Sequence, residues 1–76
     1  MSYRTKGYVL AQAFTYRIDI HDSIDLPAGS FVLPMDARWV PKETKIRVGK
    51  PNINETYAYT KYGIIIIPIK LVRLAN

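Results

Sequence analysis

The sequence predicts an all-β domain, a small barrel or sandwich of five or six short strands. No window keeps apolar residues at the i, i+3, i+4, i+7 spacing of a helix beyond two turns, whereas period-2 alternation recurs. Five prolines and four glycines interrupt the chain at short intervals, as they do between short strands. A chain of 76 residues has room for one domain, which we take as residues 1–76.

Two strands are predicted near the N-terminus, over residues 3–10 and 14–20. The first is interrupted by a glycine. The second has the clearest alternation in the chain, with polar residues between Phe14, Tyr16, Ile18 and Ile20. The segment 21–30 then reads as a loop, because Pro27 presets φ and Gly29 accepts a positive φ.

The middle of the chain is predicted to hold short strands separated by loops. Strands over residues 31–33 and 35–40 each end at a proline, since proline cannot donate to the interior of a ladder. Residues 42–54 are charged and rich in turn formers, so we expect mostly loop there, with one short strand at 45–48.

The C-terminal third predicts a hairpin and a short closing strand. Residues 55–60 and 63–67 are expected to pair, with Gly63 supplying the left-handed backbone of the turn. Four consecutive isoleucines fit a strand covered on both faces. Closure into a barrel would keep that strand away from an exposed edge. After it, residues 69–71 read as one tight helical turn and 72–74 as a last strand.

Several motifs stand in the order found in one group of small barrels. Residues 13–16 match an aromatic opening motif, and residues 22–26 match the acidic hairpin loop that follows it. Gly29 and residues 31–33 match a diverging turn and the next strand. The closing pattern is carried by Gly63, Pro68 and Val72. Together these motifs resemble an SH3-like small β-barrel. The resemblance implies that fold, whose members serve as protein binders, nucleic-acid binders and assembly parts.

The sequence carries no motif for catalysis or for a bound cofactor. The absence of cysteine excludes disulfide scaffolds and Cys-ligated metal sites. There is no Gly-rich phosphate loop, dinucleotide fingerprint or activated nucleophile. His21 and the aspartates between residues 19 and 25 lack the calcium pattern closed by a glutamate, so a solvated acidic loop is the preferred interpretation. We therefore predict no enzyme, no cofactor, no metal and no small-molecule substrate.

The chain also lacks features of a membrane or exported protein. Its longest apolar run, residues 64–67, is far too short to cross a bilayer. The N-terminal segment has Arg4 and Lys6 but no apolar stretch of signal-peptide length. We expect no membrane partner and a location inside the cell or within a particle.

The formal charge of +5 is unevenly distributed along the chain. Residues 19–25 hold three of the six acids and no lysine or arginine. Elsewhere all 11 Lys and Arg stand against the other three acids, a formal +8. This dipolar pattern fits docking to a protein at least as well as docking to a polyanion, and solubilisation alone is the plain alternative.

The first functional hypothesis is a non-enzymatic protein-binding or assembly module. Its partner would be another protein or further copies of the chain, and a bare barrel suits a subunit of a larger complex such as a phage or viral particle. Tyrosine and tryptophan are frequent at interfaces, and for Trp39 partial burial is favoured. The candidate binding residues are Tyr16, Asp22, Asp25, Trp39, Tyr57 and Tyr59.

The alternative hypothesis is a nucleic-acid-binding barrel. A basic stretch lies between residues 38 and 50, and Tyr57, Tyr59 and Lys61 would share one strand face. Cations beside aromatics on a sheet can stack single-stranded bases, although packing of these tyrosines in the core is equally expected. The candidate residues are Arg38, Lys42, Lys45, Arg47, Lys50, Tyr57, Tyr59 and Lys61.

Overall fold

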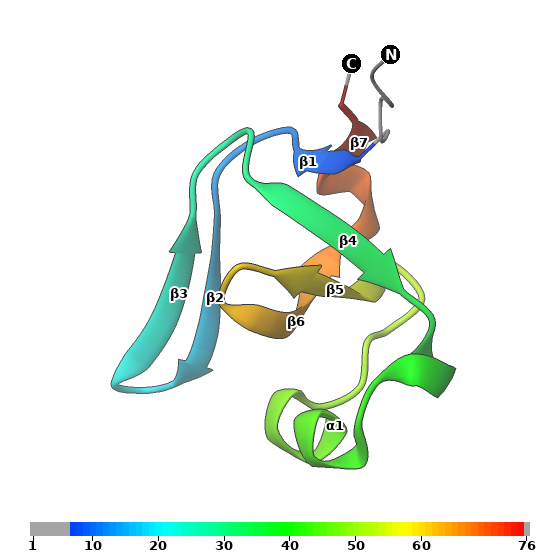
Figure 1. The fold of residues 1–76 in the computed structure, drawn as a ribbon. Helices are drawn as coiled ribbons and strands as arrows, with labels where there is room; N and C mark the ends of the chain where they lie inside the picture. The colour runs from blue at the N-terminus through cyan, green and yellow to red at the C-terminus, as the bar shows by residue number, and fades with distance from the viewer. Residues whose placement is uncertain (1–6, 76) are drawn as a thin grey trace.

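The structure, a computed structural model, describes residues 7–75 and is mostly β (Figure 1). Within these residues the strands are β1 (Tyr8–Leu10), β2 (Phe14–Asp19), β3 (Asp22–Leu26), β4 (Phe31–Met35), β5 (Glu55–Thr60), β6 (Gly63–Pro68) and β7 (Val72–Leu74). The helical elements are the 3-10 helices η1 (Ala37–Trp39) and η2 (Ile69–Leu71) and the α-helix α1 (Lys42–Val48). The predicted all-β class is confirmed, with one short α-helix added.

The strands form two antiparallel sheets. Five strands pair in the order β6-β5-β4-β1-β7, and β2 pairs with β3 as a separate hairpin that projects to one side (Figure 1). β4 pairs with β1 at Phe31 and Val32, and with β5 from Leu33 to Met35, so it connects the two halves of the large sheet. Over the described residues the sheets do not close into the predicted barrel.

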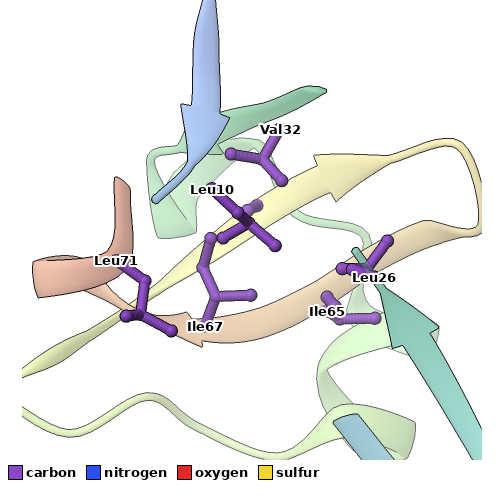
Figure 2. Close-up of a cluster of buried hydrophobic side chains, with 7 residues drawn as sticks. Leu10, Leu26, Val32, Ile65, Ile67 and Leu71 are labelled. Atoms are coloured by element: carbon purple, nitrogen blue, oxygen red, sulfur yellow. The ribbon is translucent and has the colours of Figure 1, made fainter. Parts of the chain in front are cut away.

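The hydrophobic core lies on both faces of the β5–β6 hairpin. The main cluster, shown in Figure 2, consists of Leu10, Leu26, Val32, Ala58, Ile65, Ile67 and Leu71. A smaller cluster on the other face consists of Val40, Tyr57 and Ile66, with Met35, Val48 and Ile64 packed against it. The isoleucine run therefore contributes alternately to both clusters, which confirms the prediction of a strand covered on both faces.

The predicted loop over residues 21–30 is wrong in its first part, because residues 22–26 form β3. Aspartate and serine gave this segment the composition of a loop, yet Ile24 and Leu26 alternate correctly for a strand. These two residues pair with Tyr16 and Phe14 of β2. The apolar pairs explain why an acidic segment forms a strand.

The β2 strand has the predicted alternation of half-buried and exposed residues, but it ends at Asp19 rather than at residue 20. Ile20 lies instead in the turn of the hairpin, where its side chain is 79% exposed. The last residue of the predicted apolar face, Ile20, is therefore exposed to solvent. For the predicted first strand, the structure has β1 only at Tyr8–Leu10, and residues 3–6 lie outside the described residues.

The predicted strand over residues 35–40 is also wrong. β4 continues through Pro34 to Met35, because proline's φ suits an extended chain even though its N–H is missing. The chain then turns into η1, and the Asp36 side chain caps this turn by accepting a hydrogen bond from the Arg38 backbone N–H at 2.9 Å. This local bond competes with strand formation.

Residues 42–48 form α1 instead of the predicted loop and short strand. Glu43 in the first turn and two basic residues in the last turn complement the helix dipole. Gly49 ends the helix with φ +87°, a conformation that favours glycine. A helix of two turns is too short to show the repeated helical spacing that would have revealed it in the sequence.

The C-terminal predictions are confirmed. The β5–β6 hairpin turns at Lys61 and Tyr62, and Gly63 has the expected positive φ of 108°. β6 extends one residue further than predicted, to Pro68. The single helical turn η2 and the short strand β7 follow where they were expected, and β7 pairs with β1.

Candidate functional site

The outer face of the large sheet carries three large apolar side chains in open solvent. Phe31, Leu33 and Tyr59 are 73%, 56% and 55% exposed. Leu33 and Tyr59 are directly paired across β4 and β5, and Phe31 lies two residues before Leu33, so all three point to the same face. We call these three residues the outer patch.

The patch is exposed because α1 and η1 cover only the other end of the same face. Met35 and Tyr57, the next pair along β4 and β5, are packed against Val40 and Val48. Residues of these strands that point to the opposite face, such as Val32, are buried in the main cluster. The strands are therefore apolar on both sides, with one end of the outer side left uncovered.

Basic residues border the outer patch. Lys61 lines two shallow hollows together with Phe31, and one of these hollows also includes Leu33 and Tyr59. Arg73 pairs with Val9, which in turn pairs with Phe31, so this arginine belongs to the same face. Of the described residues that line the two hollows, none is an aspartate or glutamate.

Two of the candidate binding tyrosines hold the end of α1 instead of facing solvent. The Tyr16 hydroxyl donates to the Val48 carbonyl oxygen at 3.0 Å, and the Tyr57 hydroxyl donates to the Gly49 carbonyl oxygen at 2.8 Å. Tyr57 is only 3% exposed. Burial raises the pKa of the Tyr16 phenol above its ordinary value of 10.0, so this hydroxyl remains a donor to a higher pH than a free phenol does.

Trp39 is 73% exposed, so the expectation of partial burial is wrong. Its position in η1, outside both core clusters, leaves the indole in solvent. The neighbouring Arg38 forms a 3.0 Å ion pair with Asp36. The hydrogen bonds from Arg38 hold the pKa of the Asp36 carboxyl below its usual value.

The structure divides the surface expected for nucleic acid into separate parts. Its five basic residues lie in η1, in α1 and just after α1, namely Arg38, Lys42, Lys45, Arg47 and Lys50. Tyr57 is in the smaller core cluster, whereas Tyr59 is in the outer patch. Lys61 lies in the turn after β5 rather than in the strand, with its Nζ 5.1 Å from the centre of the Tyr62 ring.

Three of the six acidic residues, Asp19, Asp22 and Asp25, lie on the β2–β3 hairpin, and these three are exposed. The Asp19 Oδ1 accepts a hydrogen bond from the His21 backbone N–H at 2.7 Å, and Asp25 Oδ1 accepts one from the Thr15 hydroxyl at 2.7 Å. Asp22 pairs with Asp19 across the hairpin. Two of the candidate residues, Asp22 and Asp25, are thus placed on one projecting element.

Across residues 7–75, no three His, Cys, Asp or Glu side chains are grouped as they would be to hold a metal ion. In the same part of the chain, no helix has the length and apolar character needed to cross a membrane.

In comparisons with known proteins, the chain matches no protein-family model, no curated protein and no solved structure.

Phe31 and Leu33 are the surface residues that sequence reasoning missed. The run Phe31-Val32-Leu33 predicts a strand correctly, but three consecutive apolar residues do not show which face is buried. Only the pairing with β1 and β5, and the limited reach of α1, determine that the odd-numbered side chains remain exposed.

Proposed function

We propose that this chain is a non-enzymatic protein-binding or assembly module, and that the outer patch is its binding surface. The observation that carries the proposal is the exposure of Phe31, Leu33 and Tyr59 side by side on one sheet face. Contiguous exposed apolar side chains rimmed by polar groups are characteristic of interaction sites. The patch lies on paired strands, so little ordering entropy is lost when a partner binds.

The proposed scaffold is an open, divergent form of the SH3-like barrel, in which the two sheets do not close over residues 7–75. Support comes from the element order, in which a projecting hairpin precedes three successive antiparallel strands, β4 to β6. A single turn of 3-10 helix, η2, then leads into β7, which returns beside β1. This scaffold leaves the outer patch and the hairpin on separate parts of the surface.

Site-specific cross-linking tests the proposed surface. A photoreactive phenylalanine analogue would replace Leu33 in one variant and Ile53 in a control, and both would be irradiated in the cells of origin. Ile53 is a highly exposed isoleucine in a turn, far from the patch in sequence. We expect one defined protein adduct from position 33, reduced by Phe31→Ser, and no such adduct from position 53.

An equal pattern of adducts from both positions would contradict the proposal. So would the absence of any protein adduct from position 33. Because the substituted side chain is already exposed, the fold should be unchanged, and circular dichroism provides that check.

Binding of a nucleic acid is the second candidate function, and the exposed Trp39 favours it. Residues 38–50 contain five basic residues and one acid, and the exposed Trp39 directly follows Arg38 in this segment. An exposed aromatic ring beside cations can stack on an unpaired base while lysines and arginines contact phosphates. This surface is formed by η1 and α1, so it is separate from the outer patch.

Binding of single- and double-stranded oligonucleotides at two salt concentrations tests this second function. Phosphate contacts make affinity fall steeply as salt rises. Trp39→Ala should weaken binding to single strands, whereas Leu33→Ser, in the outer patch, should not. If no oligonucleotide binds even at low salt, this candidate is eliminated.

A further inference from the structure

The tip of the β2–β3 hairpin has the chemistry that complements the outer patch. Among the large apolar side chains of this hairpin, Ile20 is the most exposed, and in sequence it stands between Asp19 and Asp22, which pair across the hairpin. The bond from the His21 N–H to Asp19 holds the turn in shape. The tip therefore presents one apolar side chain between two negative charges.

The outer patch offers the opposite arrangement. Its apolar surface is formed by Phe31, Leu33 and Tyr59, and Lys61 and Arg73 lie at its border. An isoleucine set between carboxylates matches this surface both in apolar contact and in charge.

A single copy cannot bring these two features together. The base of the hairpin is fixed, because Phe14 and Leu26 pair there and both belong to the main core region. Figure 1 shows the tip of the β2–β3 hairpin far from the start of β4, where Phe31 lies. A hairpin tip that docks on the patch must therefore belong to another copy of the chain.

We propose that the outer patch binds the β2–β3 hairpin tip of a second copy of this chain. Ile20 of one copy packs on Phe31 and Leu33 of the next, and Asp19 and Asp22 face Lys61 and Arg73. This inference rests on the proposed function and names the partner for the same surface.

The contact is heterologous, because the two surfaces that meet are different. Each copy presents one tip and one patch, so association continues head to tail into rings or filaments. A hairpin tip buries less than the roughly 1,600 Å² of a standard interface. Self-association is therefore weak, concentration-dependent and reduced by salt.

Sedimentation velocity of mixed variants tests this arrangement. Ile20→Ser removes the apolar side chain of the hairpin tip and leaves the outer patch intact. Leu33→Ser removes an apolar side chain of the outer patch and leaves the hairpin tip intact. Each variant alone should remain monomeric at concentrations where the wild-type chain associates. A mixture of the two should form one-to-one dimers and nothing larger, because only one productive contact remains.

Three further variants distinguish this contact from non-specific hydrophobic association. Ile53→Ser removes another highly exposed isoleucine in a turn and should leave self-association unchanged. Asp22→Lys should weaken self-association about tenfold, and Lys61→Asp in the same chain should restore it.

A wild-type chain that is strictly monomeric up to high concentration would overturn the inference. So would unchanged self-association of Ile20→Ser, or a failure of the two variants to combine. Cross-linking from position 33 to a different protein would still support the proposed function in that case, so the two failures are distinguishable.

Discussion

The hydroxyl groups of Tyr16 and Tyr57 fix the end of α1 to the sheet. The last carbonyl groups of a helix have no partner within it, and here two of the carbonyls at this end, those of Val48 and Gly49, accept hydrogen bonds from these phenols. Tyrosine has an apolar ring and a polar tip, which suits this position as well as it suits an interface. The residue type alone could not distinguish the two roles.

Removal of these hydroxyl groups should destabilise the fold. Tyr57→Phe leaves the Gly49 carbonyl without this donor and should cost about 1 kcal/mol of unfolding free energy, measured by urea denaturation. Tyr59→Phe is the matched control, because its ring is exposed in the outer patch, and should change stability by less than about 0.5 kcal/mol. Equal losses from both variants would contradict the structural role of Tyr57.

The raised pKa of Tyr16 predicts a loss of stability in alkali. A group with a higher pKa in the folded state keeps its stabilising effect below its unfolded pKa of 10.0 and loses it as the pH rises through the folded value. The unfolding free energy should therefore fall above pH 10, and Tyr16→Phe should reduce that fall. An identical alkaline profile for the variant would show that another group is responsible.

At the scale of elements, strands and turns with a local sequence signal were predicted, whereas α1, which depends on contacts distant in sequence, was not. The alternation of β2 and the turn at Gly63 required only near neighbours, so the sequence shows them. α1 is two turns long, and it is held by packing of Val48 and by the two tyrosines, which come from distant strands. Its formation therefore depends on tertiary contacts that no local pattern contains.

The end of α1 depends on the backbone conformation of Gly49. Its φ of +87° is strained for any residue with a Cβ, so Gly49→Ala should destabilise the domain by about 1–3 kcal/mol. Gly7→Ala is a suitable control, because a Cβ there would meet the Phe31 ring at an ordinary contact distance of 3.7 Å. Thermal unfolding of the two variants gives the comparison, and a Gly49→Ala variant as stable as wild type would exclude the strain.

At the scale of the whole molecule, the β5–β6 hairpin organises two clusters and leaves part of one face open. The sequence showed that the isoleucine strand is covered on both sides, but the extent of that cover depends on where α1 lies. The sequence therefore shows which segments carry acidic or basic residues. It does not show that Phe31, Leu33 and Tyr59 form one exposed surface, because that depends on the position of α1.

Core and surface apolar residues should differ sharply in their contribution to stability. Ile67 is fully buried in the main cluster, so Ile67→Ala should cost about 2–5 kcal/mol by denaturant unfolding. Leu33 is exposed in the outer patch, so Leu33→Ala should change stability by no more than about 0.5 kcal/mol. A large loss for Leu33→Ala would show that this side chain serves the fold rather than binding.

Hydroxyl-radical footprinting tests the binding surface most directly. Oxidation rates of exposed side chains would be compared between the isolated chain and the protein in complexes taken from its own cells. We expect protection of Phe31, Leu33 and Tyr59 in the complex, with Trp39 equally reactive in both samples. Protection of Trp39 with an unprotected outer patch would contradict it and would favour the basic surface of η1 and α1.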